Sequence, residues 1–374
     1  MRATKAIIHL DNLEHNIVQV KKLLQPETKI CLPVKADAYG HGAIQVSIAA
    51  IKAGVSVLAV ASVREGTELR DAGIVAPIIS LSLPTLSEID EILTNNIHPL
   101  VMDSEFIKAL NERAGKLNTV GKVHLKIDTG MSRIGCTPHE ATELARLIAS
   151  CEHLQLCGIA THFSVADSKK AENIAFTQKQ IRVFSEAVQS IRNAGVKAGL
   201  VHAANSGAII QYPESYFDMV RPGIIVYGYP PSDELAGALD LKPVMSLITR
   251  VVLIKKLEAG TPVSYGCTWR AEKDTYIGTL PIGYADGLTR SLSHGLKVRI
   301  GKTFYPIVGT ICMDQCMVDL GSTLNVKRWD EVEIFGTNTE EQSNTADTLA
   351  KIGGTISYEI LANINKRVPR VYLS

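Results

Sequence analysis

One lysine in this chain stands where a charged side chain needs either a partner or a chemical use. Lys35 follows the apolar segment 30–34, which predicts a buried strand, and a charge at the end of such a strand is costly unless it is paired. After it come Tyr39, a glycine pair and a predicted helix start near Ala43. An amine that faces backbone amides able to hold an anion suits a Schiff base to a phosphorylated aldehyde cofactor. The plain alternative is a lysine that snorkels from a strand edge, and this segment alone leaves both interpretations open.

The elements that must position this lysine alternate between short apolar runs and amphipathic helical patterns over the first 230 residues. The predicted strands are 30–36, 57–62, 77–82, 98–103, 122–128, 156–163, 199–205 and 219–227. The predicted helices are 11–24, 43–53, 85–95, 104–117, 138–150 and 171–194. Strands separated by helices indicate a parallel sheet, and a count of eight favours a closed (β/α)8 barrel. An open doubly wound sheet would carry a GxGxxG after its first strand, which is missing here.

The composition changes at the Pro-rich stretch 229–241, which predicts a linker. Beyond it, alternating patterns predict a second, β-rich unit with a helical stretch at 345–365. Its predicted strands are 244–257, 262–265, 275–281, 296–300, 303–309, 315–320 and 331–336. We therefore predict an α/β chain: an N-terminal (β/α)8 barrel over 1–235, followed by a mainly β C-terminal domain over 236–374.

Composition excludes several classes of function. With 374 residues, 46% hydrophobic, 21% charged and a net charge of +1, the chain has ample core and no excess of basic residues for nucleic acid. It has neither an apolar run long enough for a membrane span nor a signal peptide pattern at its start. The seven cysteines are odd in number and irregularly spaced, which predicts reduced thiols and a cytoplasmic location. Cys312 and Cys316 have no second pair, so we predict no metal site.

The sequence VKADAYGHG (34–42) resembles the pyridoxal-phosphate lysine motif of alanine racemases. Further blocks follow in that family's order: HLKIDTGMSRIG (124–135), THF (161–163), HAANSGA (202–208), VRPGI (220–224), VSYG (263–266), GYADG (283–287), CMDQ (312–315) and YE (358–359). The resemblance covers nearly the whole chain. It implies an enzyme that interconverts L-alanine and D-alanine by a two-base pyridoxal 5'-phosphate mechanism and supplies D-alanine for peptidoglycan.

The resemblance also implies a role for each matching residue. Lys35 and Tyr265 would be the two catalytic bases. The cofactor would be held by Lys35, Tyr39, His162, Asn205, Ser206, Arg221, Gly223, Ile224 and Tyr358. The substrate would be bound by Arg133 and Met313, and the supporting residues would be Lys126, His202, Tyr284 and Asp314. Racemisation needs a base on each face of the α-carbon, and a free tyrosine of pKa ~10 is ionised in roughly one molecule per thousand at neutral pH.

Several of these assignments have structural alternatives. Arg221 would face the pyridine nitrogen of the cofactor and be oriented by His202, or it is an arginine paired on the surface before a proline turn. Lys126 is carbamylated in similar enzymes, or it is a plain lysine paired to Asp128. Tyr265 is the second base, or a tyrosine packed before a glycine turn. The departures from the family pattern are Pro33, Asp37, Ser132 and Ser357, of which Ser132 adjoins the carboxylate-binding Arg133.

The predicted strands bring the predicted residues to one place. Lys35 ends strand one, Arg133 follows strand five, His162 ends strand six, Asn205 and Ser206 end strand seven, and Arg221 to Gly223 lie at strand eight. Active sites of such barrels lie at the carboxyl ends of the strands, so we expect one site there. The resemblance further implies a homodimer in which the second domain of one chain supplies Tyr265 and Met313 to the barrel of the other. The alternatives are a serine-preferring or broader racemase, a decarboxylase of similar architecture, and a non-enzymatic cofactor carrier made of the barrel alone.

Overall fold

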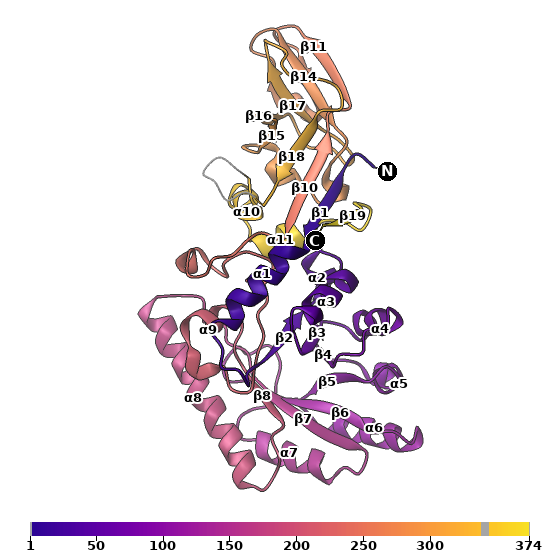
Figure 1. Cartoon of the computed structure of the whole chain (residues 1–374), viewed down its shortest axis with the longest axis vertical. Coiled ribbons are helices and arrows are strands. Elements are labelled where there is room, and N and C mark those ends of the chain that lie inside the picture. Colours follow the sequence, from indigo (N-terminus) through magenta and orange to yellow (C-terminus); the bar gives the residue numbers. More distant parts are fainter. Residues whose placement is uncertain (1, 338–343, 374) are drawn as a thin grey trace.

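The computed structural model of the chain describes residues 2–337 and 344–373. These residues form an elongated molecule, with a barrel at one end and a sheet-rich part at the other (Figure 1). Eight parallel strands close into the barrel: β2 (Lys29–Pro33), β3 (Val57–Val60), β4 (Ile78–Ser80), β5 (Ile97–Val101), β6 (Gly121–Lys126), β7 (Leu154–Ala160), β8 (Leu200–His202) and β9 (Met219–Val220). The predicted (β/α)8 barrel followed by a mainly β unit is confirmed.

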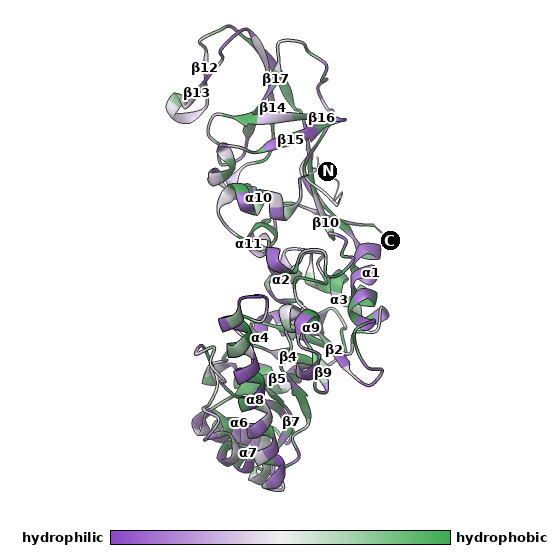
Figure 2. Ribbon diagram, turned by 90° about the vertical axis from the view of Figure 1, so that its left-hand side faces the viewer, coloured by the Kyte–Doolittle hydropathy of each residue, from purple (hydrophilic) through white to green (hydrophobic). Residues whose placement is uncertain are grey.

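Helical segments precede the first barrel strand and connect the others, and the longer ones cover the outside of the barrel. They are α1 (Leu10–Lys21), α2 (Lys35–Tyr39), α3 (Ala43–Lys52), α4 (Val63–Asp71), α5 (Ile89–Thr94), α6 (Ser104–Lys116), α7 (Ala141–Ser150), α8 (Ala171–Asn193) and α9 (Ser206–Gln211). Because successive strand residues point to opposite faces, β2 directs Ile30 and Leu32 into the large core under the helices and Cys31 into a separate cluster with Ala59 and Met219. Figure 2 shows the resulting hydrophobic interior along strands such as β7.

The barrel differs from the prediction in several places, including β2, β9 and α4. Strands β2 and β9 are shorter than the predicted 30–36 and 219–227, because the chain turns sharply at the residues that form the site. The helix α4 was not predicted, although Ser62 and Glu65 form a capping box at its start. That Ser-x-x-Glu spacing is a sequence signal for a helix N-terminus, so the helix was predictable.

The second unit is built on one sheet of nine strands, in the order β11-β14-β17-β16-β15-β18-β10-β1-β19. The strands are β1 (Lys5–His9), β10 (Met245–Arg250), β11 (Leu253–Leu257), β14 (Thr275–Leu280), β15 (Lys297–Ile300), β16 (Thr303–Val308), β17 (Cys316–Gly321), β18 (Glu331–Phe335) and β19 (Arg370–Leu373). A separate two-stranded ribbon contains β12 (Pro262–Val263) and β13 (Trp269–Arg270). Two helices, α10 (Ala346–Gly353) and α11 (Ser357–Ala362), complete this part of the chain.

Both ends of the chain lie in this second sheet. Strand β1 pairs antiparallel with β10 and parallel with β19, so the first strand joins the sheet of the C-terminal part before the chain enters the barrel. Neither β1 nor β19 was predicted, because each is short and its partner lies far away in sequence. The predicted domain boundary at residue 235 stays a prediction. The structure adds that the first strand, β1, belongs to the sheet of the C-terminal part.

Three predicted segments of the second half are corrected. The strand predicted over 244–257 is two strands, because β10 pairs with β1 and β18 whereas β11 pairs with β14. The helix predicted over 345–365 is broken after Gly353, where Gly354 adopts a left-handed φ of +69°. The predicted linker 229–241 is anchored, since Tyr229 is 1% exposed and its hydroxyl accepts a hydrogen bond from the Ala346 amide at 3.3 Å.

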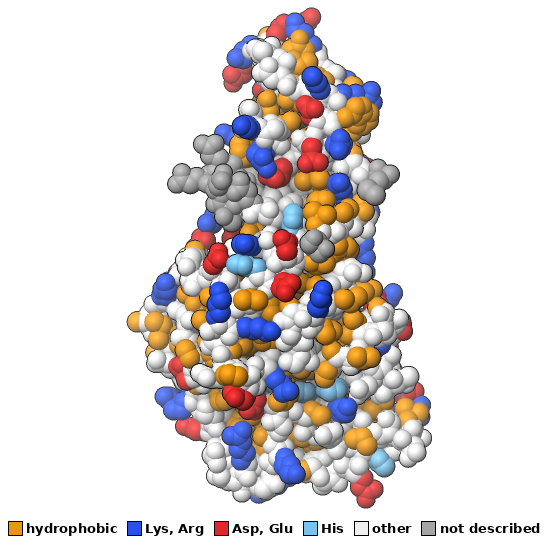
Figure 3. All heavy atoms as spheres, in the orientation of Figure 1, with side chains coloured by type: hydrophobic (Ala, Val, Ile, Leu, Met, Phe, Trp, Pro, Cys, Tyr) orange, Lys and Arg blue, Asp and Glu red, His pale blue; other side chains and the backbone are white. Residues whose placement is uncertain are grey.

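Within the described residues, no helix has both the length and the apolar character needed to cross a membrane. The face shown in Figure 3 carries basic and acidic side chains interspersed over both parts of the molecule. Apolar atoms gather in the same view where the barrel meets the second sheet.

Candidate active site

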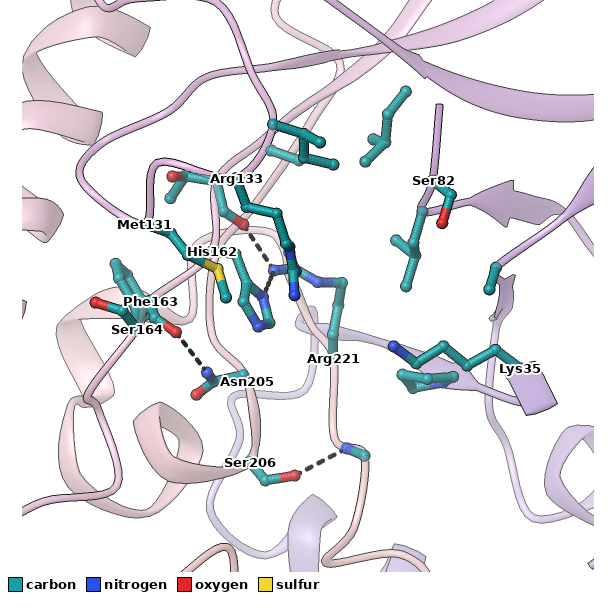
Figure 4. Close-up of a pocket in the computed structure, with 18 of the residues that line it drawn as sticks. Lys35, Ser82, Met131, Arg133, His162, Phe163, Ser164, Asn205, Ser206 and Arg221 are labelled. Atoms are coloured by element: carbon teal, nitrogen blue, oxygen red, sulfur yellow. Dashed lines mark hydrogen bonds between the residues drawn. The ribbon is translucent and has the colours of Figure 1, made fainter. Parts of the chain in front are cut away.

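A cavity of about 640 Å³ opens at the carboxyl ends of the barrel strands. It brings together predicted residues that are far apart in sequence: Lys35, Tyr39, Lys126, Arg133, His162, Asn205, Ser206, Arg221, Gly223 and Tyr358 all line it. In Figure 4, the side chains of Lys35, Arg133 and Arg221 reach toward the same space from different elements. The walls of the cavity therefore carry two lysine amines, two arginine guanidinium groups and several hydrogen-bonding groups.

Lys35 lies in a strained turn, not at the end of a strand as predicted. Strand β2 ends at Pro33, and the four residues Ala36 to Tyr39 that follow Lys35 all have φ between 52° and 54°. Left-handed conformation costs roughly 1–2 kcal/mol for each residue with a Cβ, so these four carry about 4–8 kcal/mol of local strain. Such strain persists only where the surroundings hold it in place, which marks the turn as a functional element.

The electrostatic surroundings favour the neutral form of the Lys35 amine. Burial is the main cause that lowers the pKa of Lys35, and the positive charge of Arg133 lowers it further, while Glu65 acts in the opposite direction. Glu65 also holds the start of the turn, since its two carboxylate oxygens accept hydrogen bonds from the amides of Ala36 and Ala61, at 2.7 Å each. A lysine in this setting is a better base and nucleophile than an exposed one.

Arg221 is fixed in the floor of the cavity and is not a surface residue. One terminal nitrogen donates to His202 Nδ1 at 2.7 Å, and the other donates to the carbonyls of Thr161 at 2.7 Å and Ala203 at 2.9 Å. The second nitrogen also lies 3.1 Å from His162 Nδ1. Burial lowers the pKa of Arg221 to about 10, so the guanidinium stays charged at neutral pH.

The donor set of Arg221 decides the tautomers of its histidine neighbours. Because the guanidinium has only donors, the ring nitrogens that face it in His202 and His162 must be acceptors. His202 then carries its proton on Nε2, which lies 3.0 Å from His124 Nδ1. Burial is the first cause that lowers the pKa of His202, followed by the charge of Arg221, so the ring stays neutral. His202 thus orients Arg221 as a neutral acceptor.

Three further residues that line the cavity, Tyr39, Ser206 and Gly223, form a narrow cradle. The Gly223 amide donates to Ser206 Oγ at 2.9 Å, and a Cβ on Gly223 would meet Tyr39 Oη at 3.1 Å. Burial raises the pKa of Tyr39 to about 12, which keeps its hydroxyl a donor. The Tyr39 ring lies against Tyr358, with centroids 5.9 Å apart. Backbone amide and hydroxyl donors in so small a space suit a phosphate group.

Asn205 holds the local backbone beside this cradle. Its side-chain oxygen accepts from the Ala208 amide at 3.1 Å and caps α9, and its amide nitrogen donates to the Phe163 carbonyl at 3.1 Å. Ile224, the remaining predicted cofactor residue, is fully buried in the core and is not among the residues that line the cavity. Its predicted contact through the backbone stays a prediction.

Lys126 is buried beside Arg133 and is not paired with Asp128. Its Nζ donates to the Ile127 carbonyl at 3.1 Å, whereas Asp128 accepts hydrogen bonds from the amides of Gly130 and Ser132 at 2.9 and 3.1 Å. Burial, followed by the charge of Arg221, lowers the pKa of Lys126 to about 7. Ser132, where the family more often has glycine, adopts a left-handed φ of 57°.

The other predicted residues form a second group, on the surface of the C-terminal part. Tyr265, Met313 and Tyr284 are 73%, 52% and 41% exposed, and neither they nor Asp314 line the cavity. Hydrogen bonds join their backbones: the Tyr284 amide donates to the Cys312 carbonyl at 3.1 Å, and the Ala285 amide donates to the Met313 carbonyl at 3.0 Å. Asp314 accepts from Arg367 at 2.7 Å. One chain thus presents two incomplete halves of a predicted site.

Sequence reasoning missed several residues that hold the cavity. Glu65, His124 and His41 support the predicted groups from behind, and Asp167 lines the cavity with a pKa that burial raises. The capping spacing of Ser62 and Glu65 signalled a helix start. No pattern in the sequence could show that the same carboxylate reaches across to the Lys35 turn.

Known proteins resemble this chain along its whole length. A family model for the N-terminal domain of alanine racemase matches residues 8–231, and one for the C-terminal domain matches residues 244–372. The chain belongs to the alanine racemase family. The alanine racemase of Treponema denticola is 64% identical and that of Treponema pallidum 48% identical, with 100% of this chain covered in both and 99% and 100% of the respective relative.

Solved structures of alanine racemases agree with the fold. The enzyme of Clostridium difficile 630 superposes with a TM-score of 0.94 at 40% identity, covering 100% of this chain and 96% of the other. A Bacillus anthracis alanine racemase with bound L-Ala-P superposes with a TM-score of 0.92 at 33% identity, with the same coverage. The matches include both halves of the chain, so they favour the racemase interpretation over a carrier built from the barrel alone. The resemblance read from the sequence is confirmed.

Proposed function

We propose that this member of the family interconverts L-alanine and D-alanine with pyridoxal 5'-phosphate bound at Lys35, and so supplies D-alanine for peptidoglycan. The observation that carries the proposal is the single cavity that holds the Lys35 amine, the fixed charge of Arg221 and the cradle of Tyr39, Ser206 and Gly223. A phosphorylated pyridine aldehyde has complementary parts: an aldehyde for the amine, a ring nitrogen for the guanidinium, and a phosphate for the cradle.

The residues fit that cofactor on structural grounds. The cradle is so narrow that a side chain on Gly223 would crowd the Tyr39 hydroxyl, which leaves the space for a ligand group. When bound, pyridoxal phosphate supplies an electron sink for the α-carbon of an amino acid. Arg221 keeps its proton at neutral pH because its pKa, although burial lowers it, stays at about 10. A charged guanidinium beside the ring nitrogen would keep that nitrogen unprotonated, so Arg221 would weaken the sink and restrain side reactions.

Two side chains would then exchange the α-proton on opposite faces. Lys35 Nζ has the lowered pKa that a neutral base requires. Tyr265 Oη would serve the other face, while Arg133 binds the substrate carboxylate with its planar fork and Met313 adds a backbone amide. Tyr284 and Asp314 would narrow the channel and favour a small side chain. His162, which lines the cavity with its Nδ1 3.1 Å from Arg221, would be one of the residues that hold the cofactor.

The second base would come from a partner chain in a homodimer. Tyr265 is 73% exposed and lies outside the cavity of its own chain, although a base must reach the substrate. A pair of chains related by a two-fold axis would place each Tyr265 and Met313 over the partner's barrel, giving two equal shared sites. The same pairing would cover an exposed tyrosine and methionine that a monomer leaves in water.

The test is a direct assay of the purified protein with added cofactor. Borohydride should fix the cofactor onto Lys35, and a panel of amino acids in heavy water should show α-proton exchange fastest with both enantiomers of alanine. A protein that stays colourless and inert with pyridoxal phosphate contradicts the proposal. Exchange that is faster with serine, or equally fast with larger side chains, would favour a serine-preferring or broad-range racemase. Carbon dioxide release would favour a decarboxylase.

A further inference from the structure

Several backbone carbonyls of the strained turn that carries Lys35 accept hydrogen bonds from side chains that do not belong to the barrel strands. We name residues 35–42 the lysine turn. His41 lies 2.9 Å from each of the Ala38 and Tyr39 carbonyls through Nδ1, and the Arg370 Nε donates to the Gly40 carbonyl at 3.0 Å. Arg370 begins β19, so one of these contacts comes from the last strand of the C-terminal sheet.

Arg370 binds four carbonyls with a single guanidinium. Besides Gly40, its terminal nitrogens donate to the carbonyls of Asn365 and Val368, both at 2.7 Å, and of Ile364 at 2.6 Å. The last three belong to the segment that follows α11, the helix that carries Tyr358. Arg370 therefore joins the lysine turn to the end of the helix whose Tyr358 lines the cofactor cavity beside Tyr39.

The lysine turn packs against the C-terminal part of the chain at several points: the Tyr39 ring lies against Tyr358, and a Cβ on Gly42 would overlap the Tyr372 hydroxyl. A Cβ on Gly40 would overlap the Leu361 carbonyl oxygen, so the lysine turn touches α11 backbone to backbone. On its other side the turn borders a second cavity of about 580 Å³, lined by Ala36, Asp37, Gly40 and Arg370 itself. To these packing contacts the Arg370 guanidinium adds directional hydrogen bonds to carbonyls of both segments, with Nε on the lysine turn and the terminal nitrogens on the segment after α11.

We infer that Arg370 is a positioning residue for the cofactor site: it holds the lysine turn against the end of α11 and so fixes Lys35 and Tyr39 relative to Tyr358. The inference rests on the proposed function, because it assigns the purpose of the junction to the cofactor. Without the Arg370 guanidinium, the left-handed turn loses the hydrogen bond that restrains Gly40. Lys35 and Tyr39 are then held less firmly in position relative to Tyr358.

The chain contains a matched control in Arg70. It is half-buried like Arg370, burial lowers the pKa of both guanidinium groups, and it also binds four carbonyls. Its donors reach Asn95 at 2.8 Å, Ile74 at 2.7 Å, Ala76 at 2.8 Å and Asn96 at 3.1 Å. These contacts tie α4 to the loops on the outside of the barrel, and Arg70 does not line the cofactor cavity. Both arginines therefore bind four backbone carbonyls, but only Arg370 binds a carbonyl of the lysine turn beside the cofactor cavity.

The experiment compares Arg370→Lys with Arg70→Lys. Lysine keeps the charge but replaces the planar fork by one point donor, so both variants should lose thermal stability. The dissociation constant of pyridoxal phosphate, measured by quenching of protein fluorescence, should rise about tenfold or more in Arg370→Lys, the loss expected for one charge-assisted hydrogen bond. It should change less than about twofold in Arg70→Lys, because its carbonyl contacts are outside the site. The visible absorbance of the bound cofactor should also shift its pH dependence only in Arg370→Lys.

Equal changes in cofactor affinity in the two variants would show that Arg370 acts through general stability, and unchanged affinity in Arg370→Lys would remove its role altogether. A wild-type protein that binds no pyridoxal phosphate defeats the proposed function instead, so the two failures are distinguishable. If Arg370→Lys does not fold, hydrogen exchange of the wild-type holoenzyme decides. Peptides 35–43 and 363–370 should then exchange as one unit, and a peptide 35–43 that exchanges together with α3 and independently of 363–370 overturns the inference.

Discussion

Lys126 should react with carbon dioxide at neutral pH and become a carbamate that positions Arg133. Carbamylation requires the neutral amine, and burial with the charges of Arg221 and Arg133 lowers the pKa of Lys126 to about 7. The same reaction would turn a cation into an anion in a cavity that already holds two arginines. An anion there can accept hydrogen bonds from Arg133, which orients that fork for the substrate carboxylate.

The size of the effect follows from the fraction of neutral amine. At pH 8 an ordinary lysine of pKa ~10.4 is about 0.4% neutral, whereas a pKa of about 7 gives about 90% neutral, a gain of about 200-fold. Carbamate formation must increase with pH, because protonation of the Lys126 amine blocks the reaction with carbon dioxide. The neutral fraction of Lys126 falls to about a tenth at pH 6, so carbamate should be lost as pH falls from 8 to 6.

Carbon-13 NMR of the protein equilibrated with labelled bicarbonate would measure the carbamate directly. One carbamate resonance should be present at pH 8, weaken through pH 7 and be absent from Lys126→Arg, which keeps the cation but cannot be carbamylated. The KM for alanine should rise as the resonance fades, and the variant should show a raised KM without that dependence. A wild-type spectrum with no such resonance at pH 8, or one whose intensity is unchanged at pH 6, would refute the reasoning.

Three further outcomes follow from the site. Tyr265→Phe should lower racemisation about 10²–10⁴-fold, and in heavy water exchange from D-alanine, which would use Lys35, should survive better than exchange from L-alanine; equal losses argue against the facial assignment. Mixing Lys35→Ala with Tyr265→Ala should restore about a quarter of wild-type activity, since random exchange puts about half the chains in mixed dimers with one intact site each; no recovery despite confirmed subunit exchange would place both bases on one chain. Gly223→Ala should weaken cofactor binding, measured by fluorescence quenching, with little loss of Tm, because its Cβ would lie 3.1 Å from Tyr39 Oη; unchanged affinity would exclude the cradle as the phosphate site.

Much of the barrel could be predicted because its strands are continuous apolar runs separated by amphipathic helices. That pattern needs no knowledge of distant partners, and it placed Arg133, His162 and Arg221 at one end of the barrel. The strand lengths were wrong where function bends the chain. Strand β9 ends at Val220, because the next residue leaves the ladder to place Arg221 among Thr161, His162 and His202.

The rest depends on pairings between residues that are distant in sequence. Strand β1 exists because it pairs with β10 and β19, which lie more than two hundred residues further along the chain. Its five residues alone could therefore not predict a strand. The left-handed lysine turn was also out of reach, since Ala36 and Asp37 have no intrinsic preference for positive φ comparable with glycine. Family resemblance gave the expected roles of the site residues. Only the structure identified the residues that hold them in place: Glu65, His124 and Arg370.

The strain in the lysine turn is connected with the position of β1 in the sheet of the C-terminal part. A left-handed run of four residues cannot hold itself, so its restraints must come from elements stable enough to oppose the strain. Glu65 restrains its start from the barrel side, and Arg370 restrains its end from the second sheet. Strand β19, which carries Arg370, is held in turn by β1, the segment that leads into the barrel. Residues of both parts of the chain thus restrain the turn that carries Lys35, and both parts also line the cavity, since Tyr358 lies there with Lys35.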